Sequence, residues 1–147
     1  MAVKRIEPDE AARLMEDGWR YVDVRSVPEF EQGHAPGAYN VPLLHFEAGR
    51  GMTPNARFLQ VFQAAFELED RLIIGCKSGG RSARAADLLS KAGFAALVDM
   101  RGGYSGEIDK SGAVVCAGWS ARGLPCTTEC DAGRDYDSIR SRDGEPD

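Results

Sequence analysis

Three apolar residues, Leu72-Ile73-Ile74, run directly into Gly75-Cys76-Lys77-Ser78-Gly79-Gly80-Arg81-Ser82. The apolar run is typical of a short buried strand. Beyond it, apolar side chains recur at helical spacing and the pattern stops at a glycine, through Ala85, Leu88, Leu89, Ala92 and Gly93. The stretch therefore predicts a strand, a glycine-containing loop and a helix, and such a loop is where α/β folds usually bind ligands.

The rest of the chain alternates in the same way, which favours an α/β domain with a mostly parallel sheet. Residues 7–18 predict a helix, because Pro8 and acidic residues fall in its first turn. Tyr21–Val24 and residues 94–98 are typical of further strands. Thr53-Pro54 predicts the start of another helix, whose apolar face holds Phe58, Val61, Phe62, Ala65 and Phe66.

The composition excludes several classes of protein. A length of 147 residues and a hydrophobic fraction of 43% suit one domain with a real core. The formal net charge is −5, so neither nucleic acid nor an anionic membrane is the expected partner. No run approaches the roughly 20 apolar residues of a membrane span, and the N-terminus turns acidic too early for a signal peptide. Four cysteines without an export signal indicate a reducing compartment, so we expect a soluble, cytoplasmic protein.

Cys76 is the candidate nucleophile. The first turn of the following helix leaves backbone amides without acceptors and carries partial positive charge, so a curled loop forms an anion nest. Gly79 and Gly80 permit that curl and keep side chains out of it. A cysteine at the bottom of such a nest is expected to be largely thiolate at neutral pH. Lys77 and Arg81 add two positive charges that suit an anionic substrate.

The spacing within the loop narrows the chemistry. An inert, buried cysteine is the competing interpretation, but it does not explain two glycines and two cations nearby. Four residues separate Cys76 from Arg81, whereas cysteine phosphatases typically have five, so the tighter ring favours one extra sulfur atom over a phosphoryl group. Thiolate attack on sulfur needs no histidine base when the leaving group is an anion such as sulfite. We expect substrate contacts from Lys77, Ser78, Gly79, Gly80, Arg81 and Ser82.

These residues resemble the rhodanese family. The similarity extends over roughly Glu7 to Cys126 and rests on Asp23-Val24-Arg25, Glu29-Phe30, Gly33 to Ala38, Asn40-Val41-Pro42, the loop Cys76 to Ser82, Gly102-Gly103, Gly118-Trp119 and Gly123-Leu124-Pro125. It implies a three-layer α/β fold with a five-stranded parallel sheet flanked by helices. It also implies that Cys76 takes sulfur from thiosulfate or another donor and passes it to cyanide or a thiol. No cofactor is implied.

The first of these motifs is interpreted as support for the loop. Arg25 and Glu29 are expected to pair with each other, and Asp23 is expected to bond neighbouring backbone. His34 lies in a turn rich in glycine and proline, where an imidazole often bonds backbone. No metal site is expected, because His45, the other histidine, has no carboxylate or cysteine at metal-ligand spacing.

The sequence departs from the family after Gly103. Residues 104–117 form an apparent insertion within a domain placed at residues 7–130, and a flap over the active site and a surface loop are both open, with length favouring the surface loop. Residues 131–147 are polar and charged, with Tyr136 and Ile139 as the large apolar residues, which predicts a solvated tail outside the core.

Three functions remain open from the sequence. The first is a sulfurtransferase that works through a Cys76 persulfide. The second is a sulfur carrier or interaction module that serves a partner protein, and the third is a cysteine phosphatase or arsenate reductase. Cys116, Cys126 and Cys130 are interpreted as ordinary thiols, with the alternative that one of them accepts or resolves sulfur from Cys76.

Overall fold

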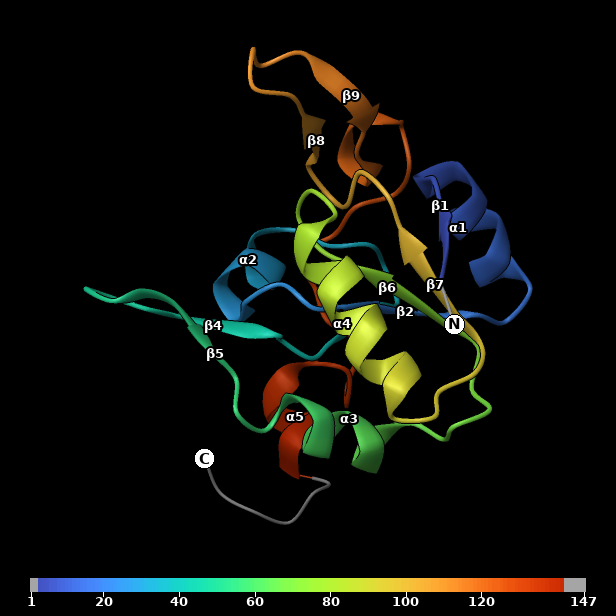
Figure 1. Cartoon of the computed structure of the whole chain (residues 1–147), viewed down its shortest axis with the longest axis vertical. Coiled ribbons are helices and arrows are strands. Elements are labelled where there is room, and N and C mark those ends of the chain that lie inside the picture. Colours follow the sequence, from blue (N-terminus) through green and yellow to red (C-terminus); the bar gives the residue numbers. More distant parts are fainter. Residues whose placement is uncertain (1–2, 142–147) are drawn as a thin grey trace.

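A five-stranded parallel sheet forms the centre of the molecule (Figure 1). The computed structural model describes residues 3–141. The strand order is β1-β7-β6-β2-β3, and every neighbouring pair is parallel, which confirms the sheet that the resemblance implies. The strands are β1 (Lys4–Ile6), β2 (Arg20–Asp23), β3 (Tyr39–Asn40), β6 (Leu72–Gly75) and β7 (Leu97–Met100).

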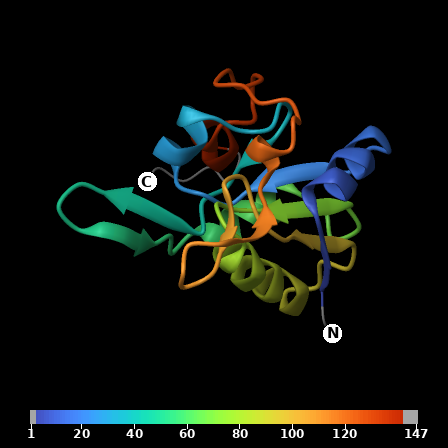
Figure 2. The ribbon, with the colours of Figure 1, turned by 90° about the horizontal axis from the view of Figure 1, so that it is seen from above.

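Helices cover both faces of this sheet and make three layers. Alternate residues of one strand point to opposite faces, so Val22 and Ile74 enter one apolar cluster while Tyr21 and Ile73 enter the other. The first cluster packs against α3 (Phe58–Ala65), α4 (Gly80–Lys91) and α5 (Tyr136–Arg140). The second packs against α1 (Pro8–Glu16), α2 (Val27–Gln32) and the short 3₁₀ helix η1 (Trp119–Ala121). Figure 2 shows α1 and α4 on opposite sides of the sheet.

The expected helix start at Thr53-Pro54 is wrong. Both residues belong to β5 (Gly51–Pro54), which pairs with β4 (Leu44–Glu47) in an antiparallel hairpin that extends away from the body (Figures 1 and 2). Pairing of Leu44 with Pro54 holds this segment extended, and α3 begins only at Phe58. The apolar face expected for that helix does enter the core, with Phe58, Val61, Phe62 and Phe66 buried.

Most of the insertion at residues 104–117 forms a β-hairpin on the surface of the domain. Strand β8 (Gly106–Ile108) pairs antiparallel with β9 (Val114–Ala117), and the Asp109 carboxylate accepts backbone N–H groups from Ser111 and Ala113 in the turn. The hairpin projects near the start of α4 (Figure 1). None of the helices within residues 3–141 is long and apolar enough to span a membrane.

The expectation that the chain after residue 130 is a tail outside the core is wrong for α5, which packs against the core. Tyr136 and Ile139 are spaced three apart, so one face of α5 carries both into the cluster with α3, and Ile139 is 0% exposed. Asp135 begins the helix by accepting the backbone N–H of Ser138. Two apolar residues at helical spacing outweigh the polar composition here. Residues 142–147 of the expected tail lie outside the described residues.

Ile139→Ala is expected to lower the free energy of unfolding by about 2–5 kcal/mol, because it leaves a cavity in the core. Urea unfolding measures the change. Ile108→Ala is the matched control, since Ile108 is 63% exposed and its truncation is expected to cost less than about 1 kcal/mol. Equal changes in the two variants would contradict the docking of α5 onto the core.

Candidate active site

Cys76 lies between the carboxyl end of β6 and the first turn of α4. Its side chain is 1% exposed. Gly79 has φ +116°, a conformation that suits glycine, and its backbone N–H donates to Sγ of Cys76 at 3.1 Å. The amides of the first turn of α4 have no acceptor within the helix itself. The loop therefore places a sulfur atom against a backbone donor at the positive end of a twelve-residue helix.

A buried polar chain runs from this sulfur to a neighbouring strand. Oγ of Ser82 lies 3.5 Å from Sγ of Cys76 and 2.6 Å from Oδ1 of Asp99 on β7. The other carboxylate oxygen of Asp99 accepts Nε–H of Arg5 at 3.0 Å. Burial raises the pKa of the Asp99 carboxyl, although the Ser82 and Arg5 hydrogen bonds oppose the shift. In this polar chain the thiol of Cys76 donates to Oγ of Ser82, and the Ser82 hydroxyl donates to Asp99.

Sequence reasoning missed Asp99 and Arg5. The available signal was an acidic residue inside the buried run Leu97–Met100, because a carboxylate on a central strand is costly without partners. Its partners come from the loop helix and from the first strand, 17 and 94 residues away along the chain.

The segment that follows β7 is hydrogen-bonded to the backbone of the Cys76 loop. The backbone N–H of Tyr104 donates to the carbonyl of Cys76 at 2.7 Å, and that of Ser105 donates to the carbonyl of Lys77 at 2.8 Å. Gly103 has φ +60°, and a Cβ atom on it would lie 2.5 Å from the carbonyl oxygen of Cys76. The pair Gly102-Gly103 thus allows a close approach of two backbones.

Arg81 forms a two-pronged ion pair with Glu29, and its predicted contact with substrate stays a prediction. Its Nη1 and Nη2 donate to the two carboxylate oxygens of Glu29 at 2.7 and 2.9 Å. Burial opposes ionisation of Glu29, but hydrogen bonds from Arg81 and Ser26 lower its pKa from 4.5 to about 2. The pair therefore stabilises the fold at neutral pH and loses that contribution only as the pH falls from about 4.5 toward 2.

The expected pair between Arg25 and Glu29 is wrong, because each residue has a closer partner. Arg25 donates to both carboxylate oxygens of Asp23, with Nη2 at 2.7 Å, and to the carbonyl of Gly33 at 2.6 Å. Its guanidinium also lies 4.4 Å from the ring centre of Tyr104. Asp23 accepts the backbone N–H of Arg25 as well, as the sequence predicts. This buried ion pair fixes the position of Arg25, which in turn contacts Gly33 and Tyr104 beside the Cys76 loop.

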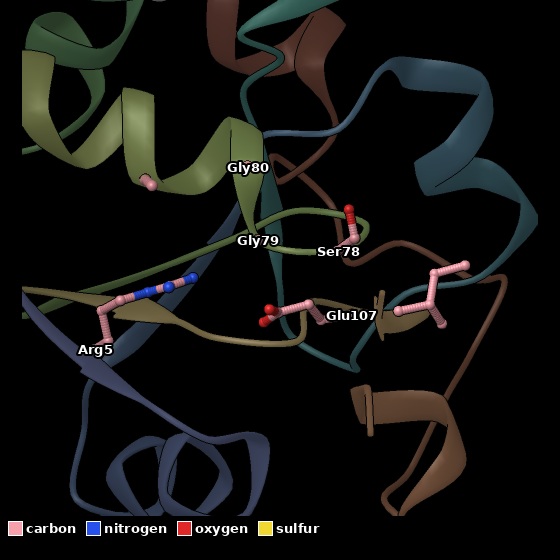
Figure 3. A pocket seen from close by; sticks show the side chains of 7 residues that line it. Arg5, Ser78, Gly79, Gly80 and Glu107 are labelled. Atoms are coloured by element: carbon pink, nitrogen blue, oxygen red, sulfur yellow. The ribbon is translucent and has the colours of Figure 1, made fainter. Parts of the chain in front are cut away.

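The remaining loop residues border two cavities. Lys77 is exposed, has no ion pair within residues 3–141, and lines a cleft of about 240 Å³ with Arg25, Glu29, Tyr104 and Ser105. Ser78, Gly79 and Gly80 line a second pocket, of about 400 Å³, on the side of Arg5 and the β8–β9 hairpin (Figure 3).

The other residues singled out from the sequence lie apart from this sulfur chain. The ring nitrogens of His34 lie 2.7 and 2.8 Å from the carbonyl oxygens of Phe30 and Glu129, so His34 bonds backbone as expected. Cys116 is buried beside Arg122. Cys126 and Cys130 are exposed, and burial together with nearby aspartates raises the pKa of Cys130.

Comparison with known proteins places the chain in a family. The rhodanese-like domain matches residues 7–108, and the chain belongs to that family. It is 43% identical over 112 residues to thiosulfate sulfurtransferase 16, chloroplastic, of Arabidopsis thaliana, covering 76% of this chain and 82% of that protein. It is 44% identical over 94 residues to rhodanese-like domain-containing protein 15, chloroplastic, of the same plant, covering 64% of this chain and 51% of that one. It therefore spans about half the length of the second relative.

A solved structure agrees with this placement. The crystal structure of Rv0390 from M. tuberculosis superposes with a TM-score of 0.72 at 27% identity, covering 88% of this chain and all of that one. The cytoplasmic location expected from the sequence stays a prediction, since both plant relatives are named as chloroplastic.

Proposed function

We propose that this protein is a sulfurtransferase that moves sulfane sulfur from thiosulfate or a similar donor to cyanide or a thiol, through a persulfide on Cys76. The observation that carries the proposal is the Gly79 N–H on the sulfur of Cys76 at the N-terminus of α4. Membership of the rhodanese-like family and a relative named as a thiosulfate sulfurtransferase support it.

The two half-reactions balance without a protein base. The Cys76 thiolate attacks the outer sulfur of thiosulfate, a new S–S bond forms, and sulfite leaves with the electron pair of the old bond. Cyanide then attacks the outer sulfur of the persulfide, and thiocyanate leaves as the Cys76 thiolate is regenerated. The negative outer sulfur is suited to the backbone amides of the loop.

The charge for anion binding comes from Lys77 in this proposal, since Arg81 is neutralised by Glu29. Lys77→Gln is expected to raise the KM for thiosulfate about three- to tenfold, and to affect a neutral organic trisulfide less, because one exposed charge contributes about 1 kcal/mol. Steady-state kinetics with both donors measure this. Lys91→Gln, at the far end of α4, is the control. Equal loss with both donors would contradict a charge role for Lys77.

A carrier function is the second candidate, and the β4–β5 hairpin favours it. Phe46 and Met52 pair across its strands and are 53% and 43% exposed, as suits contact with a partner protein. A high KM for thiosulfate beside efficient sulfur uptake from a desulfurase would favour the carrier.

Assays with purified protein separate these functions from phosphatase chemistry. We expect thiocyanate to form from thiosulfate and cyanide, and an aryl phosphate to remain uncleaved. Aryl phosphate hydrolysis without thiocyanate formation would overturn the proposal.

A further inference from the structure

The pocket of about 400 Å³ beside the loop has oppositely charged groups on two walls. Arg5 and Glu107 extend from β1 and β8 toward the same space below Gly79 (Figure 3). Arg5 uses Nε for Asp99, and within residues 3–141 neither of its Nη atoms has a hydrogen-bond partner. Glu107 uses Oε1 for Arg101, and its Oε2 has no partner in the same part of the chain. The pocket thus offers guanidinium donors on one side and a carboxylate oxygen on the other.

The charge balance distinguishes among ligands. Arg5 is paired with Asp99, and Glu107 with Arg101, so the four groups sum to zero. A ligand with only negative charge would be repelled by Glu107, and a ligand with only positive charge would be repelled by Arg5. A molecule with a carboxylate and an ammonium group satisfies both walls with charge-assisted hydrogen bonds.

The pocket also reaches the catalytic loop. Gly79 lines it, and the N–H of the same residue contacts the sulfur of Cys76 at 3.1 Å. A persulfide extends the side chain by one S–S bond, about 2 Å. Glu107 lies on β8 of the β8–β9 hairpin, so this hairpin supplies one wall of the pocket.

We propose that this pocket is an acceptor subsite for a small zwitterionic thiol of the amino-acid type, with its carboxylate on Arg5 and its ammonium on Glu107. The proposal rests on the sulfurtransferase function. In the transfer, the acceptor thiolate attacks the outer sulfur of the Cys76 persulfide. One S–S bond forms on the acceptor, the S–S bond to Cys76 breaks, and Cys76 leaves as thiolate.

Four small thiols test the two charges separately: L-cysteine, 3-mercaptopropionate without the ammonium, cysteamine without the carboxylate, and 2-mercaptoethanol with neither. Protein whose Cys76 has been loaded with sulfur from thiosulfate is mixed with each thiol, and the second-order rate constant for loss of the persulfide is measured. This rate constant is divided by the one for the reaction of the same variant with cyanide. Comparing variant with wild type for each thiol cancels its intrinsic reactivity.

Glu107→Gln is expected to lower the ratio of L-cysteine to 3-mercaptopropionate rates at least threefold. Arg5→Gln is expected to lower the ratio of L-cysteine to cysteamine rates by a similar factor, because only L-cysteine has a carboxylate that binds Arg5. Any damage to the loop through Asp99 slows all four thiols alike and cancels in the ratio. Lys110→Gln, on the same hairpin but outside the pocket, is expected to leave both ratios unchanged. Unchanged ratios in Glu107→Gln and Arg5→Gln would overturn the subsite.

A binding measurement separates this proposal from the sulfurtransferase proposal. S-methyl-L-cysteine cannot accept sulfur as a thiol, yet it carries both charges. We expect it to shift the amide signals of Gly79 and Gly80, with at least threefold weaker binding to Glu107→Gln. Such binding in a protein that takes no sulfur from thiosulfate would contradict the sulfurtransferase function and support the subsite. Normal loading of Cys76 with sulfur, without any binding of S-methyl-L-cysteine, would support the sulfurtransferase function and contradict the subsite.

Discussion

Cys76→Ser is expected to lower thiosulfate-dependent thiocyanate formation at least a thousandfold. Serine nearly matches the size of cysteine and fits a site that is 1% exposed, but a hydroxyl is a far weaker nucleophile toward sulfur than a thiolate. The N–H of Gly79 and the hydroxyl of Ser82 would remain around a group that does not ionise. The rate of thiocyanate formation with saturating thiosulfate and cyanide measures the loss.

Cys130→Ser is the matched control, because Cys130 is exposed and lies outside the sulfur chain around Cys76. It is expected to retain full activity, and both variants are expected to unfold at nearly the wild-type temperature. Substantial activity in folded Cys76→Ser would contradict the assignment of the nucleophile.

Gly103→Ala is expected to have the second largest effect. Its Cβ would lie 2.5 Å from both the carbonyl oxygen of Cys76 and the carbonyl carbon of Lys77, and these are backbone atoms that cannot rotate away. Overpacking and the left-handed φ of +60° together are expected to cost roughly 2–5 kcal/mol of unfolding free energy. Displacement of the loop by about 1 Å is also expected to lower activity on the order of a hundredfold.

Gly112→Ala separates the two causes. Gly112 has φ +88°, but a Cβ there would meet nothing within 4 Å. We expect about 1–2 kcal/mol of destabilisation and no loss of activity from this variant. If the two alanine variants behave alike, close contact between Gly103 and the loop is not what holds Cys76 in place.

The parts of the site that are local in sequence could be predicted from it. Leu72–Ile74 are apolar because β6 is buried on both faces, and the loop glycines follow at once. The five-stranded parallel sheet and the three layers followed from the rhodanese resemblance, whereas the order of the strands comes from the structure. These features depend on residues that are neighbours along the chain or on a motif that spans them.

The pairings between distant segments could not be predicted. Glu29 has two nearby arginine candidates in the motif and loop, and only the packing of α2 against the start of α4 decides for Arg81 over Arg25. Asp99 is partnered by Arg5 across 94 residues. The burial of Ile139 depends on a surface that α3 and the sheet create together, so a polar composition gave the wrong expectation.

The central claim is that Cys76 itself carries the transferred sulfur, and intact mass spectrometry tests it most directly. Wild-type protein treated with thiosulfate is expected to gain the mass of one sulfur atom, mapped to Cys76, and to lose it when cyanide is added. Cys76→Ser is expected to gain nothing. A label found on Cys116, Cys126 or Cys130 in wild type after cyanide-free incubation would identify a relay. Sulfur uptake that persists unchanged in Cys76→Ser, or no uptake by the wild-type protein, would contradict the account.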